Sequence, residues 1–220
     1  YGYEDNFGGR TFLNPGLLGG FPVASPEVTL VSDAQAMKRG GTGSFAYDDE
    51  GIQAQRVPII KNGIFVGYIT SRETAIKLGK KSMGSMRAEN WNFIPLIRMT
   101  NINLEAGKWK FEDLIKDTED GIYFSTNKSW SIDDKRWNFQ FGTEIAWQIK
   151  DGELKKIYKN PTYTDNSVHF WNSCDAICNK DYWKIWGIPN CGKGEPMQTA
   201  HVGHGTAPAR FKNIRVGVLE

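Results

Sequence analysis

The stretch RVPIIKNGIFVGYI, residues 56–69, decides the fold class, because it places two runs of apolar, largely β-branched residues around an Asn-Gly pair. Asn62-Gly63 is a pair preferred in two-residue type I′ hairpins, in which both turn residues have positive φ. A second stretch of this kind, EIAWQIKDGEL at 144–154, turns on Asp151-Gly152. Two such hairpins in one chain predict a mainly antiparallel sheet.

Short strands and short helices are predicted around these hairpins. The pattern predicts further strands at 28–31, 121–124 and 137–141, and helices at 71–78, 111–119 and 170–177. Strands and helices do not alternate as they do in βαβ proteins. We therefore predict an α+β fold, a mainly antiparallel β-sheet with hairpins and a few short helices packed on it. Within it, 1–26 is predicted to be an extended entry segment and 27–220 the domain itself.

The composition excludes several classes of protein. Of 220 residues, 40% are hydrophobic and 24% are charged, as in ordinary globular domains. Lys and Arg number 27 against 25 Asp and Glu, without a basic stripe, so neither nucleic acid nor a membrane is an expected partner. Three cysteines, no secretory signal and no apolar run of about 18 residues favour a reducing, cytoplasmic location. Residues 1–10 show neither helical nor strand pattern and look like the middle of a longer protein.

Cys191 is the most informative single residue. It lies in the run IPNCGKGEP, 188–196, whose glycines and prolines predict a loop. As a zinc ligand it needs further donors; His201 and His204 are nearby in sequence, although a C-x9-H-x2-H spacing matches no strong template. As a nucleophile it needs a histidine base, which His204 could supply. Packing of the thiol under neighbouring side chains is the structural alternative.

Two further groups of polar residues admit a structural or a functional role. Cys174 and Cys178 lie four apart on the third predicted helix, and we interpret them as core residues in preference to a redox or ligand pair. Arg87, Glu89 and Arg98 are interpreted as a buried ion-pair cluster in preference to a substrate contact.

The segment HGTAPARF, 204–211, and two tryptophans carry the same ambiguity. The segment is either a tight turn in which Arg210 pairs with an acid, or a wall of an active site with His204 as a hydrogen-bond donor. Trp183 and Trp186 are three apart and could line a peptide groove, although most tryptophans belong to cores and interfaces.

Short motifs in a fixed order resemble one protein family. They are DDEG at 48–51, Gln55, KNG at 61–63, SRETA at 71–75, RAE at 87–89, Pro95, RMTN at 98–101, GIY at 121–123 and NCGKG at 190–194. Pro196, Gln198, HG at 204–205 and APARF at 207–211 continue the series. Together they resemble the TldD/PmbA family, known as modulators of DNA gyrase and regarded as metallopeptidases. The resemblance extends from about Ala24 to Val218, and the tail resembles the TldD branch.

The resemblance implies a zinc peptidase. TldD proteins carry an HExxxH helix whose histidines bind zinc and whose glutamate is the general base, while a C-terminal cysteine, matched here by Cys191, is the third ligand. Lys193, Gln198 and His204 are the implied residues that support the ligand or line the substrate cleft. A related subunit, TldE or PmbA, lacks the metal ligands and pairs with TldD around a cavity. Unfolded or leader peptides add there as a β-strand and are cleaved.

One departure from the family limits what this chain can do alone. It contains no HExxxH, and its only histidines are His169, His201 and His204, so the catalytic helix is expected upstream of Tyr1. We therefore expect the C-terminal domain of a cytoplasmic TldD-like zinc peptidase, inactive by itself. Its expected partners are the HExxxH domain of the same protein and a TldE/PmbA-like subunit or a second copy. The alternatives are a non-catalytic TldE/PmbA-like scaffold domain that shapes a peptide-binding cavity, and binding to gyrase or DNA, which the near-neutral charge disfavours.

Overall fold

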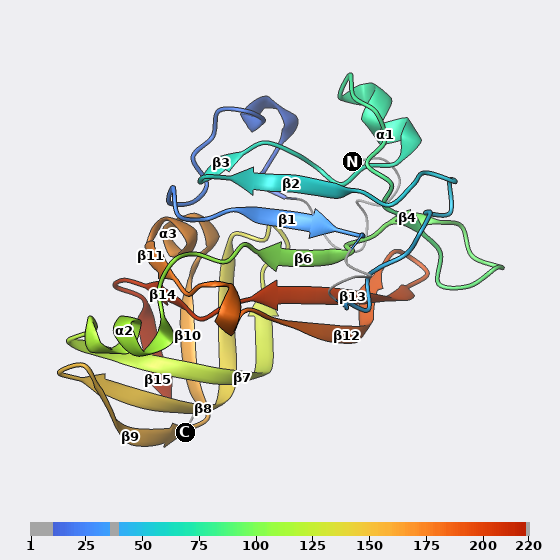
Figure 1. Cartoon of the computed structure of the whole chain (residues 1–220). Coiled ribbons are helices and arrows are strands. Elements are labelled where there is room, and N and C mark those ends of the chain that lie inside the picture. Colours follow the sequence, from blue (N-terminus) through green and yellow to red (C-terminus); the bar gives the residue numbers. More distant parts are fainter. Residues whose placement is uncertain (1–10, 36–39, 219–220) are drawn as a thin grey trace.

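The computed structural model describes residues 11–35 and 40–218, so the predictions for 1–10 lie outside the described residues. A six-stranded sheet forms its upper part, with β3 at the top and β12 at the lower edge (Figure 1). Its strands, in spatial order, are β12 (Lys184–Lys193), β13 (Gln198–Thr206), β6 (Asn101–Leu104), β1 (Leu30–Asp33), β2 (Arg56–Lys61) and β3 (Ile64–Phe65). Neighbouring strands are antiparallel, except that β13 and β6 are parallel.

A second sheet lies below the first and is built on the long strand β8 (Figure 1). Its path is β15 (Arg215–Val218), β10 (Pro161–Asn166), β8 (Asn138–Lys150) and β7 (Asp120–Ile132), and β9 (Glu153–Lys159) also pairs with β8. Two small antiparallel pairs complete the strands: β4 (Met86–Arg87) with β5 (Leu96–Ile97), and β11 (Cys174–Ile177) with β14 (Ala209–Phe211).

The α-helices of the described residues are short. They are α1 (Arg72–Lys77), α2 (Phe111–Lys116) and α3 (Ser167–Asn172), and 3-10 turns lie at Pro15–Leu17 and Lys180–Tyr182. Ser71 caps α1, which lies within the helix predicted at 71–78, and its side chain accepts a hydrogen bond from the Thr74 N–H. The predicted α+β fold with a mainly antiparallel sheet is confirmed. No helix in 11–35 or 40–218 has the length and apolar character needed to cross a membrane.

Both predicted hairpins form. Asn62 and Gly63 have φ of 48° and 81°, and Asp151 and Gly152 have φ of 52° and 73°, which is the positive-φ pair that a type I′ turn requires. Gly63 is also needed for space, because a Cβ there would lie 2.3 Å from the carbonyl oxygen of Ala24. Local turn chemistry therefore fixes both the β2–β3 and the β8–β9 connections.

The third predicted helix was wrong in its second half. α3 ends at Asn172, and Cys174–Ile177 is the strand β11. Cys174 pairs with Phe211 and Ile177 with Ala209, so strand pairing with a distant segment replaces the helix. The loop predicted at 188–196 was wrong for 188–193, because β12 continues to Lys193, which pairs with Gln198 of β13; residues 194–196 do lie in the turn between these strands.

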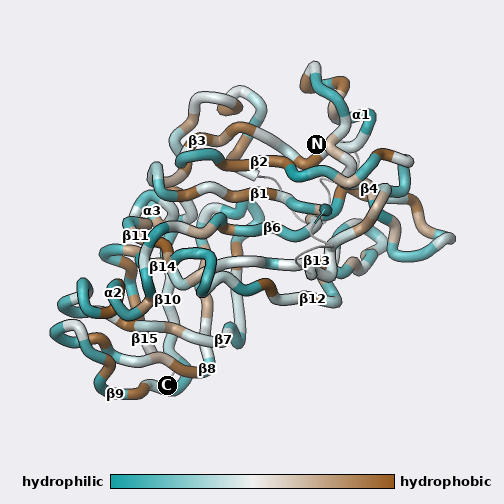
Figure 2. Tube along the Cα trace, in the orientation of Figure 1, coloured by the Kyte–Doolittle hydropathy of each residue, from teal (hydrophilic) through white to brown (hydrophobic). Residues whose placement is uncertain are grey.

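The main core lies between the six-stranded sheet and the segments that cover it. It contains buried residues of β2, β3, β6 and β11 together with residues before β1: Val23, Ala24, Val28, Ile60, Phe65, Leu104, Cys174 and Ile177. Figure 2 shows the corresponding hydrophobic segments along β2 and β3. Val23 and Ala24 belong to the predicted entry segment, so this segment contributes side chains to the core. The domain boundary at residue 27 stays a prediction.

Candidate functional site

Cys191 lies on β12, the strand at the edge of the six-stranded sheet (Figure 1). The thiol is half-buried and unpaired with any other cysteine. The register with β13 shifts between Ile188, opposite Val202, and Cys191, opposite Ala200, so two residues of β12 face one residue of β13. One of the two is Pro189, which has no N–H to give to a ladder. β-Bulges of this kind redirect side chains and are frequent beside active sites.

Arg98 holds the backbone at this bulge. Its side chain is 2% exposed, and it precedes β6 in sequence. One terminal nitrogen donates to the carbonyl oxygen of Gln198 at 3.0 Å, and the other donates to the carbonyl oxygen of Cys191. Arg98 therefore bridges β13 and β12 at the backbone of Gln198 and Cys191.

Arg87 makes a second bridge of this kind. Its guanidinium donates to the carbonyl oxygens of His201, at 2.8 Å, and Met99. The hydrogen-bonded pairing of β13 with β6 begins only at Gly203. Arg87 therefore links the segments that contain His201 and Met99 just before this pairing starts. Glu89 forms no ion pair with either arginine among the described residues, and the predicted ion-pair cluster was wrong because both guanidiniums bind backbone carbonyls.

The electrostatics around Arg87 place both arginines and the thiol in one neighbourhood. Burial and the positive charge of Arg98 together lower the pKa of Arg87 to about 10, although Cys191 and Asp49 act in the opposite direction. The Nε of Arg87 is buried and has no hydrogen-bond partner among the described residues. Arg87 therefore lies close enough to both Arg98 and Cys191 to interact with them electrostatically.

Gln198 and Lys193 attach the β4–β5 segment to the β12–β13 hairpin. The Gln198 side chain accepts a hydrogen bond from the Glu89 N–H at 3.1 Å and donates one to the Ile94 carbonyl at 2.9 Å. Lys193 donates to the Ile97 carbonyl at 2.7 Å. Both side chains support the frame around Cys191, and a contact with substrate stays a prediction for each.

The two histidines of β13 do not join Cys191. His204 lies opposite Trp186, and His201 is exposed. Ala200, the partner of Cys191, is four residues from His204, which corresponds to about 13 Å along a strand. Burial lowers the pKa of His204, and a hydrogen bond with the backbone of Ile102 partly offsets this shift. The geometry supports neither a Cys191–His201–His204 zinc site nor a Cys191–His204 nucleophile pair.

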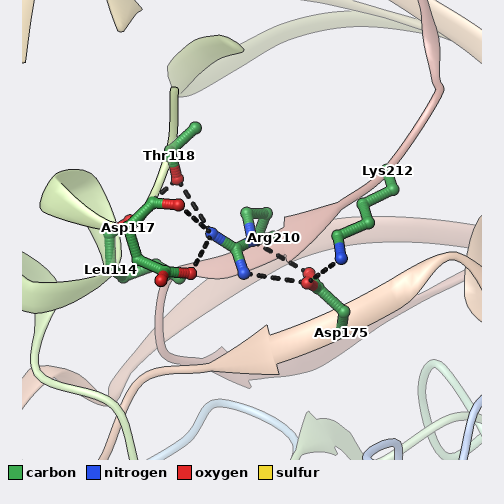
Figure 3. A network of polar contacts seen from close by, with 6 residues as sticks. All are labelled: Leu114, Asp117, Thr118, Asp175, Arg210 and Lys212. Carbon is green, nitrogen blue, oxygen red and sulfur yellow. Dashed lines mark hydrogen bonds and ion pairs between the residues drawn. The ribbon is translucent and has the colours of Figure 1, made fainter. Parts of the chain in front are cut away.

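The remaining sequence candidates are structural. Cys174 and Cys178 are buried, and burial raises the pKa of their thiols to about 12 and about 11. Arg210 pairs with Asp175 through two hydrogen bonds and with Asp117 through a third (Figure 3). Core packing for the cysteines and an acid partner for Arg210 are therefore the interpretations that the structure supports.

An aromatic cavity that the sequence did not predict lies between the two sheets. Its volume is about 1040 Å³, and its lining includes Phe141, Tyr163, Phe170, Trp186 and His204. Trp183 is not among its lining residues, and its indole N–H donates to the Leu104 carbonyl at 2.9 Å. The alternating aromatic residues of β8 were the available sequence signal, but the cavity itself requires the second sheet.

Zinc needs at least three protein donors, and the described residues offer one at this place. A thiolate is a good zinc ligand, and the Cys191 thiol is half-buried and forms no disulfide. No group of three or more His, Cys, Asp or Glu side chains that could hold a metal occurs in 11–35 or 40–218. Cys191 therefore fits zinc as one ligand of a site that other residues must complete.

Comparisons with known proteins identify the family of this chain. A family model described as the PmbA/TldA metallopeptidase C-terminal domain matches residues 6–218. A metalloprotease of Methanocaldococcus jannaschii is 36% identical over 183 residues, which cover 83% of this chain and 39% of the relative. A zinc metalloprotease TldD homolog of Saccharolobus solfataricus is 28% identical over 191 residues, which cover 87% of this chain and 42% of the relative.

Among solved structures, TldE from Thermococcus kodakarensis has a similar fold. The TM-score is 0.65 at 21% identity, and the match covers 88% of this chain and 42% of TldE. The chain thus spans less than half the length of these relatives. The family model and the Methanocaldococcus jannaschii relative confirm the resemblance seen in the sequence motifs. The chain belongs to the PmbA/TldD metallopeptidase family and contains the C-terminal domain of that family.

Proposed function

We propose that this chain is the C-terminal domain of a TldD-like zinc-dependent peptidase that cleaves unfolded or leader peptides. Cys191 supplies one zinc ligand, and an HExxxH segment outside this chain supplies the other two and the general base. The observation that carries the proposal is the placement of Cys191 on a bulged edge strand, with its backbone held by a buried arginine. The relative named a zinc metalloprotease supports the choice of metal.

Each part of the site has a distinct task in this proposal. Bound zinc would polarise the scissile carbonyl and activate a water molecule. The Cys191 thiolate would bind the metal, Arg98 binds the Cys191 carbonyl, and Arg87 binds the His201 carbonyl on the neighbouring strand. β12 is the edge of its sheet, with no partner strand on its outer side among the described residues, so an extended peptide can add there as a further strand. Alone, the chain lacks the base and is expected to be inactive.

The proposed partners follow from the family. A TldE/PmbA-like subunit or a second copy would close the peptide cavity, and the fold shared with TldE supports this arrangement. The free cysteines support a reducing, cytoplasmic location. Nucleic acid is not a proposed partner, because the formal net charge is only +2.

A second candidate function is a non-catalytic, TldE-like scaffold domain. The aromatic cavity between the sheets and the fold shared with TldE favour it. A scaffold has no need of a thiol at a bulge held by a buried arginine, so the placement of Cys191 favours the peptidase.

Zinc content and peptide cleavage of the complete protein test the proposal. Cys191→Ser should lower bound zinc and abolish cleavage of an unfolded peptide while the protein stays folded. Cys178→Ala, which removes a thiol from the core, should keep both properties. A complete protein that binds no zinc but stimulates cleavage by a TldD-like partner would support the scaffold function instead.

A further inference from the structure

We propose that Arg98 is a positioning residue that fixes the direction of the Cys191 thiol for metal binding. The inference rests on the proposed role of Cys191 as a zinc ligand, and it assigns a specific task to a buried charge that the peptidase chemistry does not use. Arg98 would not touch metal or substrate; it would act through the backbone of Cys191.

The environment of Arg98 is unusual for a charged side chain. It is 2% exposed, and no carboxylate pairs with it among the described residues. A buried charge without a counter-charge is costly unless its hydrogen bonds are satisfied. Its terminal nitrogens donate to the carbonyl oxygens of Gln198 and Cys191, and its backbone N–H donates to the Ser85 carbonyl oxygen at 2.8 Å. Both terminal nitrogens of Arg98 therefore bind the backbone of the β12–β13 hairpin.

The bulge explains why the backbone of Cys191 needs this hold. β12 has one neighbouring strand, and its register with that neighbour is interrupted immediately before Cys191. Pro189, inside the interruption, has no N–H to restore a ladder bond. The Arg98 guanidinium links Cys191 on β12 to Gln198 on β13, and so fixes the chain where the ladder resumes.

The planar guanidinium is suited to this task, and an ammonium is not. Arginine presents several donors in a fixed fork, so it reaches two carbonyls at once with a defined geometry. In Arg98→Lys the positive charge stays, but a single nitrogen on a flexible stem replaces the fork. Loss of residues that orient metal ligands typically weakens metal binding by about 10–100-fold.

The experiment uses the complete protein and compares four variants with the unmodified sequence. Zinc affinity is measured by competition with a chelator at pH 7, and the thiolate–metal bond is followed by the charge-transfer absorption of Co²⁺ in place of zinc. Arg98→Lys and Arg98→Gln test the inference, and Cys191→Ser tests the ligand itself. Arg210→Lys is the matched control, because Arg210 is a part-buried arginine in an ion-pair network on β14, which belongs to a different sheet from the strand that carries Cys191.

We expect Arg98→Lys to bind zinc about 10–100-fold more weakly and to show an altered Co²⁺–thiolate absorption, with Arg210→Lys unchanged in both. Zinc affinity of folded Arg98→Lys or Arg98→Gln within twofold of the unmodified protein would overturn the inference. Failure of both Arg98 variants to fold, with Arg210→Lys folded, would overturn it as well, because the role would then be structural only. Unchanged zinc affinity in Cys191→Ser would instead reject the proposed ligand, so the two failures are distinguishable.

Discussion

Replacement of Arg210 by methionine is expected to destabilise the fold by about 2–3 kcal/mol. Arg210 connects β14 to β11 through Asp175 and to the end of α2 through Asp117, as Figure 3 shows. The bond to Asp175 is bidentate, at 3.0 and 2.8 Å, and the side chains are 18% and 25% exposed. The Asp117 side chain is 51% exposed.

The magnitude follows from these exposures. Hydrogen bonds to charged groups contribute about 1.5–3 kcal/mol when partly buried, whereas the exposed Asp117 pair adds about 0.5 kcal/mol. Asp175 keeps a partner in Lys212, at 2.8 Å, so the loss stays below the 3–5 kcal/mol typical of a charge left unpaired. For a chain of this size, such a loss corresponds to about 4–12 °C in Tm.

Urea unfolding of Arg210→Met measures this change, and Lys212→Met is the matched control. The Lys212 side chain is 61% exposed, so its removal should cost at most about 1 kcal/mol. If the two variants lowered the free energy of unfolding equally, within about 0.5 kcal/mol, Arg210 would not be the main stabilising member of this network.

The same network predicts a pH dependence. Burial alone would raise the pKa of Asp175, but the bonds from Arg210 and Lys212 outweigh it, so the folded pKa is lowered. A lowered carboxyl pKa contributes stability that is present above the unfolded pKa of about 3.9 and is lost as pH falls through the folded pKa. The difference between the unmodified protein and Arg210→Met should therefore narrow below about pH 4.

Three further results are expected. Of the three cysteines of this chain, iodoacetamide at pH 8 should modify Cys191 alone in the metal-free folded protein, because burial raises the thiol pKa of the other two. Peptide mass mapping should show an adduct on Cys191 only, and adducts on all three would contradict this expectation. Gly107→Ala should cost about 1–3 kcal/mol in urea, because its Cβ would lie 2.2 Å from a backbone oxygen of β11, whereas Gly20→Ala, with nothing within 4 Å, should fold normally. The pKa of His204 is lowered in the folded state, so its contribution to stability is present above the unfolded value of about 6.5 and is lost as the pH falls. Between about pH 7 and pH 5, His204→Gln should therefore lose less free energy of unfolding than the unmodified protein, and identical pH profiles of the two proteins would contradict this expectation.

The sequence predicted those parts of the fold that depend on local chemistry. Asn62-Gly63 and Asp151-Gly152 set their own turns, and Ser71 sets the start of α1, so each was visible within a few residues. The strand β11 was not visible, because the partner that makes it a strand, β14, lies more than 30 residues further along the chain. Local patterns therefore identified the hairpins and missed the pairings between distant segments.

The candidate site divides in the same way. The motif around Cys191 indicated a metal ligand. The glycines and prolines of the same run suggested a loop, but Pro189 and Gly192 lie in a strand that contains a β-bulge. The roles of Arg87 and Arg98 depend on carbonyls about 100 residues away, so the sequence suggested ion pairs where the structure has backbone bridges. Only the assembled sheet reveals that a buried arginine holds the Cys191 backbone.

The position of zinc in the complete protein tests the central claim most directly. Crystals grown with zinc and measured at the zinc absorption edge should show an anomalous peak about 2.3 Å from the Sγ of Cys191. A single fully occupied zinc elsewhere, with Cys191 Sγ more than about 4 Å from it, would contradict the claim that this cysteine is a metal ligand.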